Sequence, residues 1–158
     1  MASDAARLRF NLSHSRGLAL YAVALDREVG VDVEFVRDDF AVEEIATSFF
    51  SPGEVAALKA LPACSRVEGF FNCWARKEAY VKARGEGLSI PLAHFEVSLA
   101  PGGRAALLSV LDNRREDLRW SLRGLTPGAG YAAAVAVEGR GLRLACWEWA
   151  EAACGLGR

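Results

Sequence analysis

The chain has 158 residues, enough for one domain with a sizeable hydrophobic core. Nineteen basic residues face twenty acidic ones, so no overall charge favours nucleic acid or an anionic membrane as a partner. Charged residues make up 25% and hydrophobic residues 52%, as in ordinary soluble globular proteins. The start of the sequence lacks a signal-peptide core, and no apolar run approaches the ~20 residues that span a bilayer. We therefore expect a cytoplasmic protein.

Three strands are predicted at the start of the chain. The apolar run Leu8–Leu12 stops at Ser13-His14-Ser15, and a turn at Arg16-Gly17 leads into a strand at Leu18–Leu25. A polar turn then separates this strand from a third one at Val29–Phe35. Short turns between successive strands predict a β-meander. The nearly continuous apolar run Leu18–Leu25 is typical of a strand buried on both faces.

The middle of the chain predicts helices. We expect two short ones at Val42–Phe50, after a cap from Arg37-Asp38-Asp39, and at Pro52–Ala60, with Pro52 in the first turn. A longer amphipathic helix is predicted over Val67–Arg84, ended by Gly85 and Gly87.

Strands return in the last third, separated by glycine- and proline-bearing turns. They are expected at Phe95–Leu99, Ala105–Val110, Leu118–Leu122, Tyr131–Val137 and Leu142–Trp149. The pattern predicts a single α+β domain over residues 1–158, with antiparallel strands at both ends and a helical middle. The four cysteines, Cys64, Cys73, Cys146 and Cys154, form no Cys-x-x-Cys pair, so we expect reduced thiols and no zinc site or disulfide framework.

Two acidic residues stand out in the third strand. Strand alternation places Asp32 and Glu34 on one face and Val31, Val33 and Phe35 on the other. Two carboxylates this close repel each other, and a shared hard cation such as Mg²⁺ relieves the repulsion. On this motif alone, the solvated face of an edge strand is the commoner explanation.

The long helix carries a matching polar stripe. Glu78 and Lys82 are one turn apart, and Trp74 lies one turn before Glu78. A surface ion pair beside a core tryptophan would explain the same pattern. An acid and a lysine on an otherwise buried face point instead to a site, with Trp74 packed beneath it against the Val31 and Val33 side of the strand or its neighbours.

A third element is the segment Ser13-His14-Ser15 at the end of the first strand. A histidine flanked by hydroxyls can contact phosphate through its charge and hydrogen bonds. A histidine with a purely structural role is the commoner case for such a residue taken alone.

Taken together and in this order, five segments resemble the 4′-phosphopantetheinyl transferases, specifically the surfactin-synthetase-activating type. They are Phe10–Ser15, Gly30–Glu34, Phe49–Glu54, Trp74–Lys82 and Gly85–Leu92. The resemblance implies Mg²⁺-dependent transfer of phosphopantetheine from coenzyme A to a serine of an acyl or peptidyl carrier protein, with release of 3′,5′-ADP.

The resemblance also implies roles for individual residues. Asp32, Glu34 and Glu78 correspond to the family's magnesium ligands, and Lys82 to its contact with the coenzyme A phosphates. His14 corresponds to the contact with the ribose phosphate, with Ser13 beside it. Lys77 occupies the family's lysine position before the metal glutamate, and Ser13 and Lys77 are expected among the coenzyme-binding residues. We further expect Glu78 to act as the base that takes the serine proton, and Lys82 to stabilise the negative charge that develops on the leaving group.

Two departures from the family pattern bear on function. The chain resembles the later half of a two-half architecture, without the half that supplies further basic residues. Glu86 stands in a turn where relatives often carry a basic or small residue. A partial relative that binds coenzyme A or a carrier protein without turnover is therefore the main alternative, and a metal-dependent nuclease is a second one. The missing half and the long apolar runs lead us to expect a homodimer that rebuilds the cleft.

Overall fold

The computed structural model describes residues 6–39, 41–111, 113 and 115–149. Its strands are β1 (Leu8–Ser15), β2 (Leu18–Leu25), β3 (Val29–Phe35), β4 (Phe95–Val97), β5 (Leu107–Val110), β6 (Trp120–Leu125) and β7 (Tyr131–Glu138). Its helices are α1 (Val42–Phe49), α2 (Pro52–Ala60), α3 (Ala63–Arg84) and α4 (Glu116–Arg119), with short 3-10 turns η1 (Gly87–Ser89) and η2 (Leu92–His94). The predicted α+β class is confirmed.

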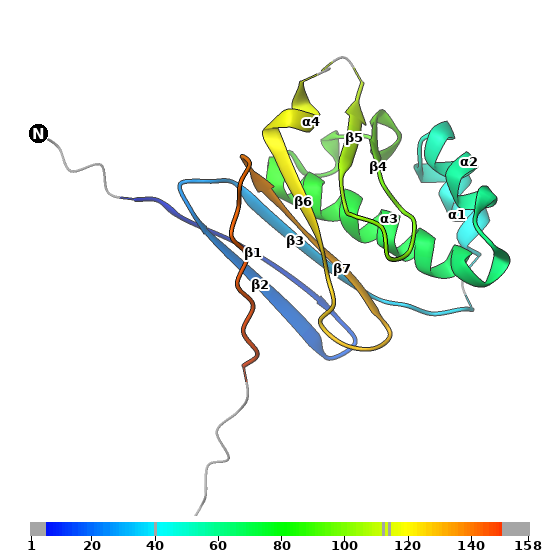
Figure 1. Ribbon diagram of the computed structural model, residues 1–158, viewed down its shortest axis with the longest axis horizontal. Coiled ribbons are helices and arrows are strands. Elements are labelled where there is room, and N and C mark those ends of the chain that lie inside the picture. Colours follow the sequence, from blue (N-terminus) through cyan, green and yellow to red (C-terminus); the bar gives the residue numbers. More distant parts are fainter. Residues whose placement is uncertain (1–5, 40, 112, 114, 150–158) are drawn as a thin grey trace, which may run out of the picture.

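The centre of the fold is a three-stranded antiparallel sheet in the order β3-β7-β6. The long helix α3 packs across β3 and β7 on one face, and the β1–β2 hairpin lies against β3 on the other side (Figure 1). Strand β7 is buried along Ala132–Ala136 because it has a strand on each side and a covered face above and below.

The predicted β-meander is wrong beyond its first hairpin. Strands β1 and β2 pair with each other from Leu8↔Leu25 to Ser15↔Leu18. Strand β3 then pairs with β7, about 100 residues later, from Val29↔Val137 to Phe35↔Tyr131. In a meander, the outer edge of β3 would pair with β2. Here its backbone N–H groups instead donate hydrogen bonds to side chains of β1.

The hairpin also corrects the expectation that β2 is buried on both faces. Its inner face packs on Val29 and Val31, whereas its outer face is exposed and apolar. This outer face consists of Leu8, Phe10 and Leu12 of β1 with Tyr21, Val23 and Leu25 of β2, each between 46% and 72% exposed.

The helices follow the sequence signals closely, with one exception. Helix α2 begins with a capping box in which Ser51 and Glu54 bind each other's backbone N–H, and Pro52 occupies the first turn. Helix α3 begins four residues earlier than predicted and ends at Gly85 in the left-handed conformation (φ 70°). The expected cap of α1 by residues 37–39 is wrong, because the N-cap position is Ala41.

Strands β4 and β5 are shorter than expected, β6 begins and ends later, β7 extends one residue further, and the last predicted strand is absent. Residues 142–149 form no strand, and Trp147 and Trp149 are 87% and 92% exposed. Cys64, Cys73 and Cys146 are free thiols, as predicted, while Cys154 lies outside the described residues. No helix in the described part of the chain is long and apolar enough to cross a membrane.

Candidate functional site

The candidate site lies where β3 crosses α3. A side chain at Gly30 would collide with the backbone of Ala79 and Ala83, so the missing Cβ lets the strand and the helix approach closely. Because side chains alternate along a strand, Asp32 and Glu34 share the face of Gly30 and also point towards α3. The predicted pairing of these two acids with the polar stripe of α3 therefore has a geometric basis.

Asp32 is the buried centre of this cluster, with 4% of its surface exposed. Its Oδ1 accepts a hydrogen bond from Ser13 Oγ at 3.0 Å and forms an ion pair with Lys82 Nζ at 2.6 Å. The Lys82 ammonium also donates to the carbonyl oxygen of Val31 at 3.2 Å. Asp32 Oδ2 is buried and has no hydrogen-bond partner in the described structure. A buried carboxylate oxygen without a hydrogen-bond partner costs folding free energy, so this atom is a candidate ligand for a cation.

Glu34 and Glu78 are half-buried and electrostatically coupled to Asp32. Burial, and then the charge of Asp32, raise the pKa of Glu34 to about 7, while Lys82 opposes the shift. The same two causes raise the pKa of Glu78. Lys82, and for Glu34 also Arg37, offset these shifts only in part, so the carboxyl groups of Glu34 and Glu78 hold their protons more tightly than exposed glutamates do.

The expected convergence of the three carboxyl groups on one cation position is not seen. Among the described residues, no three His, Cys, Asp or Glu side chains are arranged to hold a metal ion together. The donor set nevertheless fits a hard divalent cation, because Asp32 Oδ2 lacks a partner and carboxylate oxygens are the ligands that Mg²⁺ prefers. Metal binding by Asp32, Glu34 and Glu78 stays a proposal.

Ser13 and His14 lie on opposite sides of β1. Ser13 faces β3 and is buried, whereas His14 pairs with Ala19 on the exposed outer side of the hairpin. The structure thus brings Ser13 to the acidic cluster and leaves His14 at the surface beside the apolar outer face.

Lys77 lies apart from the cluster, and its expected contact with the coenzyme stays a prediction. Its side chain is completely buried, and its ammonium is 2.8 Å from Glu54 Oε2. It also donates to the carbonyl oxygens of Leu92 at 2.7 Å and Phe95 at 2.6 Å. These contacts use all three donors of the ammonium group. Lys77 therefore ties α2 and the segment after η2 to the middle of α3.

Trp74 is half-buried and packs in an aromatic group with Phe49, Phe50 and Phe70. It belongs to the core on the α3 side of the sheet, whereas Val31 belongs to the core under the hairpin. Of the expected packing against the Val31 and Val33 side of β3 or its neighbours, the part that names Val31 is therefore not seen. Trp74 also lines a pocket of about 360 Å³ that borders Glu34. The other lining residues are Ser15, Arg16, Phe35, Arg37, Phe70 and Phe71. Sequence reasoning missed this pocket, since its walls come from three separate segments.

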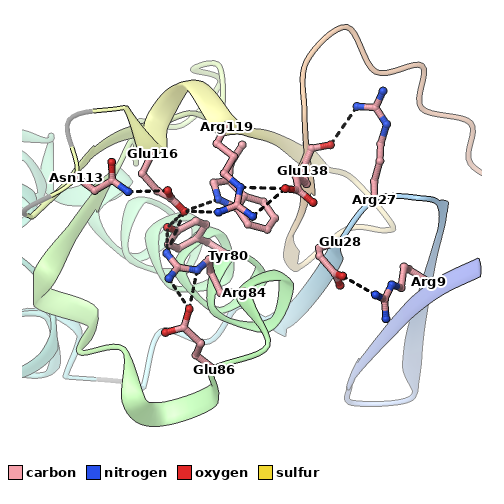
Figure 2. Close-up of polar contacts among 11 residues, drawn as sticks. Arg9, Arg27, Glu28, Tyr80, Arg84, Glu86, Asn113, Glu116, Arg119 and Glu138 are labelled. Carbon is pink, nitrogen blue, oxygen red and sulfur yellow. Dashed lines mark hydrogen bonds and ion pairs between the residues drawn. The ribbon is translucent and has the colours of Figure 1, made fainter. Parts of the chain in front are cut away.

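The C-terminal end of α3 is held by a second polar network, centred on the buried carboxylate of Glu116 (Figure 2). Glu116 accepts hydrogen bonds from Tyr80, Arg84, Asn113 and Trp120. Arg84 also pairs with Glu86, so the acidic residue in the turn after α3 is engaged within the chain. This network fixes the last turn of the helix that carries Glu78 and Lys82.

The chain is similar to known proteins of one enzyme family. Residues 28–136 match the 4′-phosphopantetheinyl transferase superfamily (ACPS). The chain is 39% identical over 142 residues to the 4′-phosphopantetheinyl transferase HetI of Nostoc sp. (strain PCC 7120), covering 90% of this chain and 56% of HetI. It is 34% identical over 98 residues to Sfp of Bacillus subtilis (strain 168), covering 62% of this chain and 42% of Sfp. The chain thus spans about half the length of these curated relatives.

Solved structures show the same fold. The ACPS–CoA complex of Chronobacterium ammoniagenes superposes with a TM-score of 0.52 at 25% identity and covers 72% of this chain and 98% of that one. The holo-[acyl-carrier-protein] synthase of Thermotoga maritima gives a TM-score of 0.55 at 23% identity, covering 72% of this chain and 63% of that one.

Proposed function

Since the chain belongs to the 4′-phosphopantetheinyl transferase superfamily, we propose that it transfers phosphopantetheine from coenzyme A to a serine of an acyl or peptidyl carrier protein. The observation that carries this proposal is the acidic cluster in which a buried oxygen of Asp32 lacks a partner beside Glu34 and Glu78. Asp32, Glu34 and Glu78 would hold Mg²⁺. When bound, the ion would neutralise charge on the pyrophosphate of coenzyme A.

The reaction exchanges one phosphorus–oxygen bond for another. The serine oxygen forms a bond to the phosphorus on the pantetheine side, the pyrophosphate bond breaks, and 3′,5′-ADP leaves with the electron pair. Positioning and charge stabilisation supply most of the rate enhancement in such transfers. Glu78, half-buried and facing Asp32, would accept the serine proton at a carboxylate oxygen.

Lys82 and His14 would bind the anionic coenzyme. Lys82 Nζ donates to Asp32 Oδ1 and to the carbonyl oxygen of Val31, which leaves one of its three donors for a phosphate oxygen. His14 is exposed on β1, next to Ser13 of the acidic cluster, and would contact the ribose phosphate. Both roles follow the family pattern.

A labelling assay tests the proposal directly. The 158-residue chain is incubated with fluorescent coenzyme A, an apo carrier protein and Mg²⁺, and transfer is read from the labelled carrier. Label should appear with Mg²⁺, disappear with a chelator, and disappear in Asp32→Asn while circular dichroism stays native. Normal turnover of Asp32→Asn would refute the metal assignment.

The alternative is a relative that binds coenzyme A or a carrier protein without turnover. It is kept open by Glu86, which stands in a turn where relatives often carry a basic or small residue. Calorimetric binding of coenzyme A without labelling of the carrier would support this alternative. The cytoplasmic location and the single-domain organisation expected from the sequence stay predictions.

The outer face of the β1–β2 hairpin supports the proposed homodimer. Its six apolar side chains are largely exposed, with on the order of 100 Å² of accessible surface each. If this face pairs with the same face of a second copy, the two together would bury roughly 1,200 Å². This area reaches the lower end of the range for stable interfaces. Light scattering at micromolar concentration should show a dimer that Phe10→Glu converts to a monomer; a monomeric parent chain would refute the pairing.

A further inference from the structure

A row of polar side chains on β1 runs along the free edge of β3. Asn11 Oδ1, Ser13 Oγ and Ser15 Oγ accept hydrogen bonds from the backbone N–H groups of Val31, Val33 and Phe35 at 3.1, 3.3 and 3.1 Å. The spacing of two residues in both strands matches because side chains and edge N–H groups both alternate. This polar row replaces the backbone pairing that a neighbouring strand would provide.

Ser13 differs from the other two members of the row because its hydroxyl also donates to Asp32 Oδ1 at 3.0 Å. A serine hydroxyl has a single proton to donate, and this one is given to a carboxylate. Ser13 is also 7% exposed. A ligand outside the protein would therefore have to break the bond to Asp32 before it could receive a hydrogen bond from Ser13.

The two donors on Asp32 occupy the same oxygen. Ser13 and Lys82 both bind Oδ1, whereas Oδ2 has no partner in the described structure. The hydroxyl is itself held by the N–H of Val33, so its direction is set by the backbone of β3. A donor that already accepts a hydrogen bond is also a stronger donor. From the β1 side, the Ser13 hydroxyl thereby holds the Oδ1 atom of Asp32 in place.

We propose that Ser13 is a positioning residue, which holds Asp32 by Oδ1 so that Oδ2 is the oxygen presented to a divalent cation. This inference rests on the proposed function, in which Asp32 is a cation ligand. It assigns Ser13 to the protein's own carboxylate, where the family resemblance places it beside the coenzyme. Groups that orient a metal ligand commonly contribute 10–100-fold to metal affinity.

The experiment measures cation binding separately from catalysis. Mn²⁺ binding to the full 158-residue chain is followed by electron paramagnetic resonance, and Mg²⁺ binding by calorimetry, both without coenzyme A. Ser13→Ala should weaken the affinity for both ions about 10–100-fold. Ser15→Ala is the matched control: it loses the same kind of bond to β3 but no carboxylate contact, and should stay within about twofold of the parent chain. Ser13→Thr keeps the hydroxyl and should recover most of the affinity.

Coenzyme A binding in the presence of chelator gives the second readout. Ser13→Ala should leave this binding within about twofold of the parent, because the hydroxyl serves Asp32. Unchanged cation affinity in Ser13→Ala, or an equal loss in Ser13→Ala and Ser15→Ala, would overturn the positioning role. So would a loss of coenzyme A affinity alone, which would make Ser13 a coenzyme ligand.

Two outcomes separate this inference from the proposed function. A parent chain that binds Mn²⁺ but transfers no label would refute transfer, while the ratio of Ser13→Ala to Ser15→Ala affinities still decides the role of Ser13. A parent chain that binds neither ion would overturn both. Melting temperatures of the two variants, expected to be alike, show that the comparison is made on folded protein.

Discussion

Replacing Lys77 by methionine tests whether this lysine is structural. The change keeps most of the apolar stem and removes the ammonium group from a site with no exposed surface. Glu54, 2% exposed, would keep hydrogen bonds from the N–H groups of Ser51 and Val97 but lose its ion pair with the Lys77 ammonium. The carbonyl oxygens of Leu92 and Phe95 would each lose a donor.

Breaking a buried ion pair from one side costs about 3–5 kcal/mol. A chain of this size has a total stability of about 5–15 kcal/mol, so the variant should lose a large fraction of it. At roughly 2–4 °C per kcal/mol, the melting temperature should fall by about 6–20 °C. Circular dichroism melts of Lys77→Met and of the exposed control Lys59→Met measure the difference, and Glu54→Gln added to Lys77→Met should recover part of the loss.

Calorimetry with coenzyme A completes this test at a temperature where both variants are folded. If Lys77 is structural, Lys77→Met binds coenzyme A as the parent chain does. An unchanged melting temperature together with weakened coenzyme binding would refute the structural assignment and restore the coenzyme contact implied by the family resemblance.

Three further predictions concern the site. Burial and neighbouring carboxylates raise the pKa of Glu34 from 4.5 to about 7, so the folded chain retains a proton that the unfolded chain releases. The stability of the chelator-treated chain should therefore be complete below pH 4.5 and fall by about 1–2 kcal/mol as the pH rises through 7, after discounting for the half-exposed side chain. Glu34→Gln should flatten this dependence in urea titrations, and an unchanged slope would contradict the assignment. Gly30→Ala should destabilise the chain by about 3 kcal/mol or more in the same assay, because its Cβ meets the backbone of Ala79 and Ala83; a loss below 1 kcal/mol would show that α3 can move away. Lys82→Ala should lower kcat, whereas His14→Ala should mainly raise the KM for coenzyme A, and a His14→Ala variant with normal KM and reduced stability would make that histidine structural.

Local patterns predicted the elements of this fold well. The positions of α2 and α3 follow from capping residues and apolar spacing, which act over a few residues. The pairing of β3 with β7 has no local signal, because its register depends on residues about 100 positions apart. Adjacency of β2 and β3 in the sequence favoured the wrong partner. The alternating Asn11, Ser13 and Ser15 were the one visible sign that β1 meets its neighbour through side chains.

The candidate site was predictable in part, for a similar reason. Alternation along β3 correctly placed Asp32 and Glu34 on one face, and Gly30 in the same face explains why α3 lies so close to them. Lys77 and Glu78 are adjacent in the sequence but point to different parts of the molecule, since neighbouring helix positions are about 100° apart. The partner of Lys77, Glu54, comes from another helix, so its burial could not be read from the sequence around Lys77.

The long-range pairing of β3 has a consequence for synthesis of the chain on the ribosome. Asp32 and Glu34 emerge early, but the strand that carries them gains its partner only when Tyr131–Glu138 has been made. Until then β3 can rest against the hairpin and α3 but presents an unpaired edge, and contacts between such distant segments form slowly. The acidic cluster is thus among the last parts of the molecule to become fixed, and a nascent chain that ends before Tyr131 would expose the apolar face of α3 to chaperones.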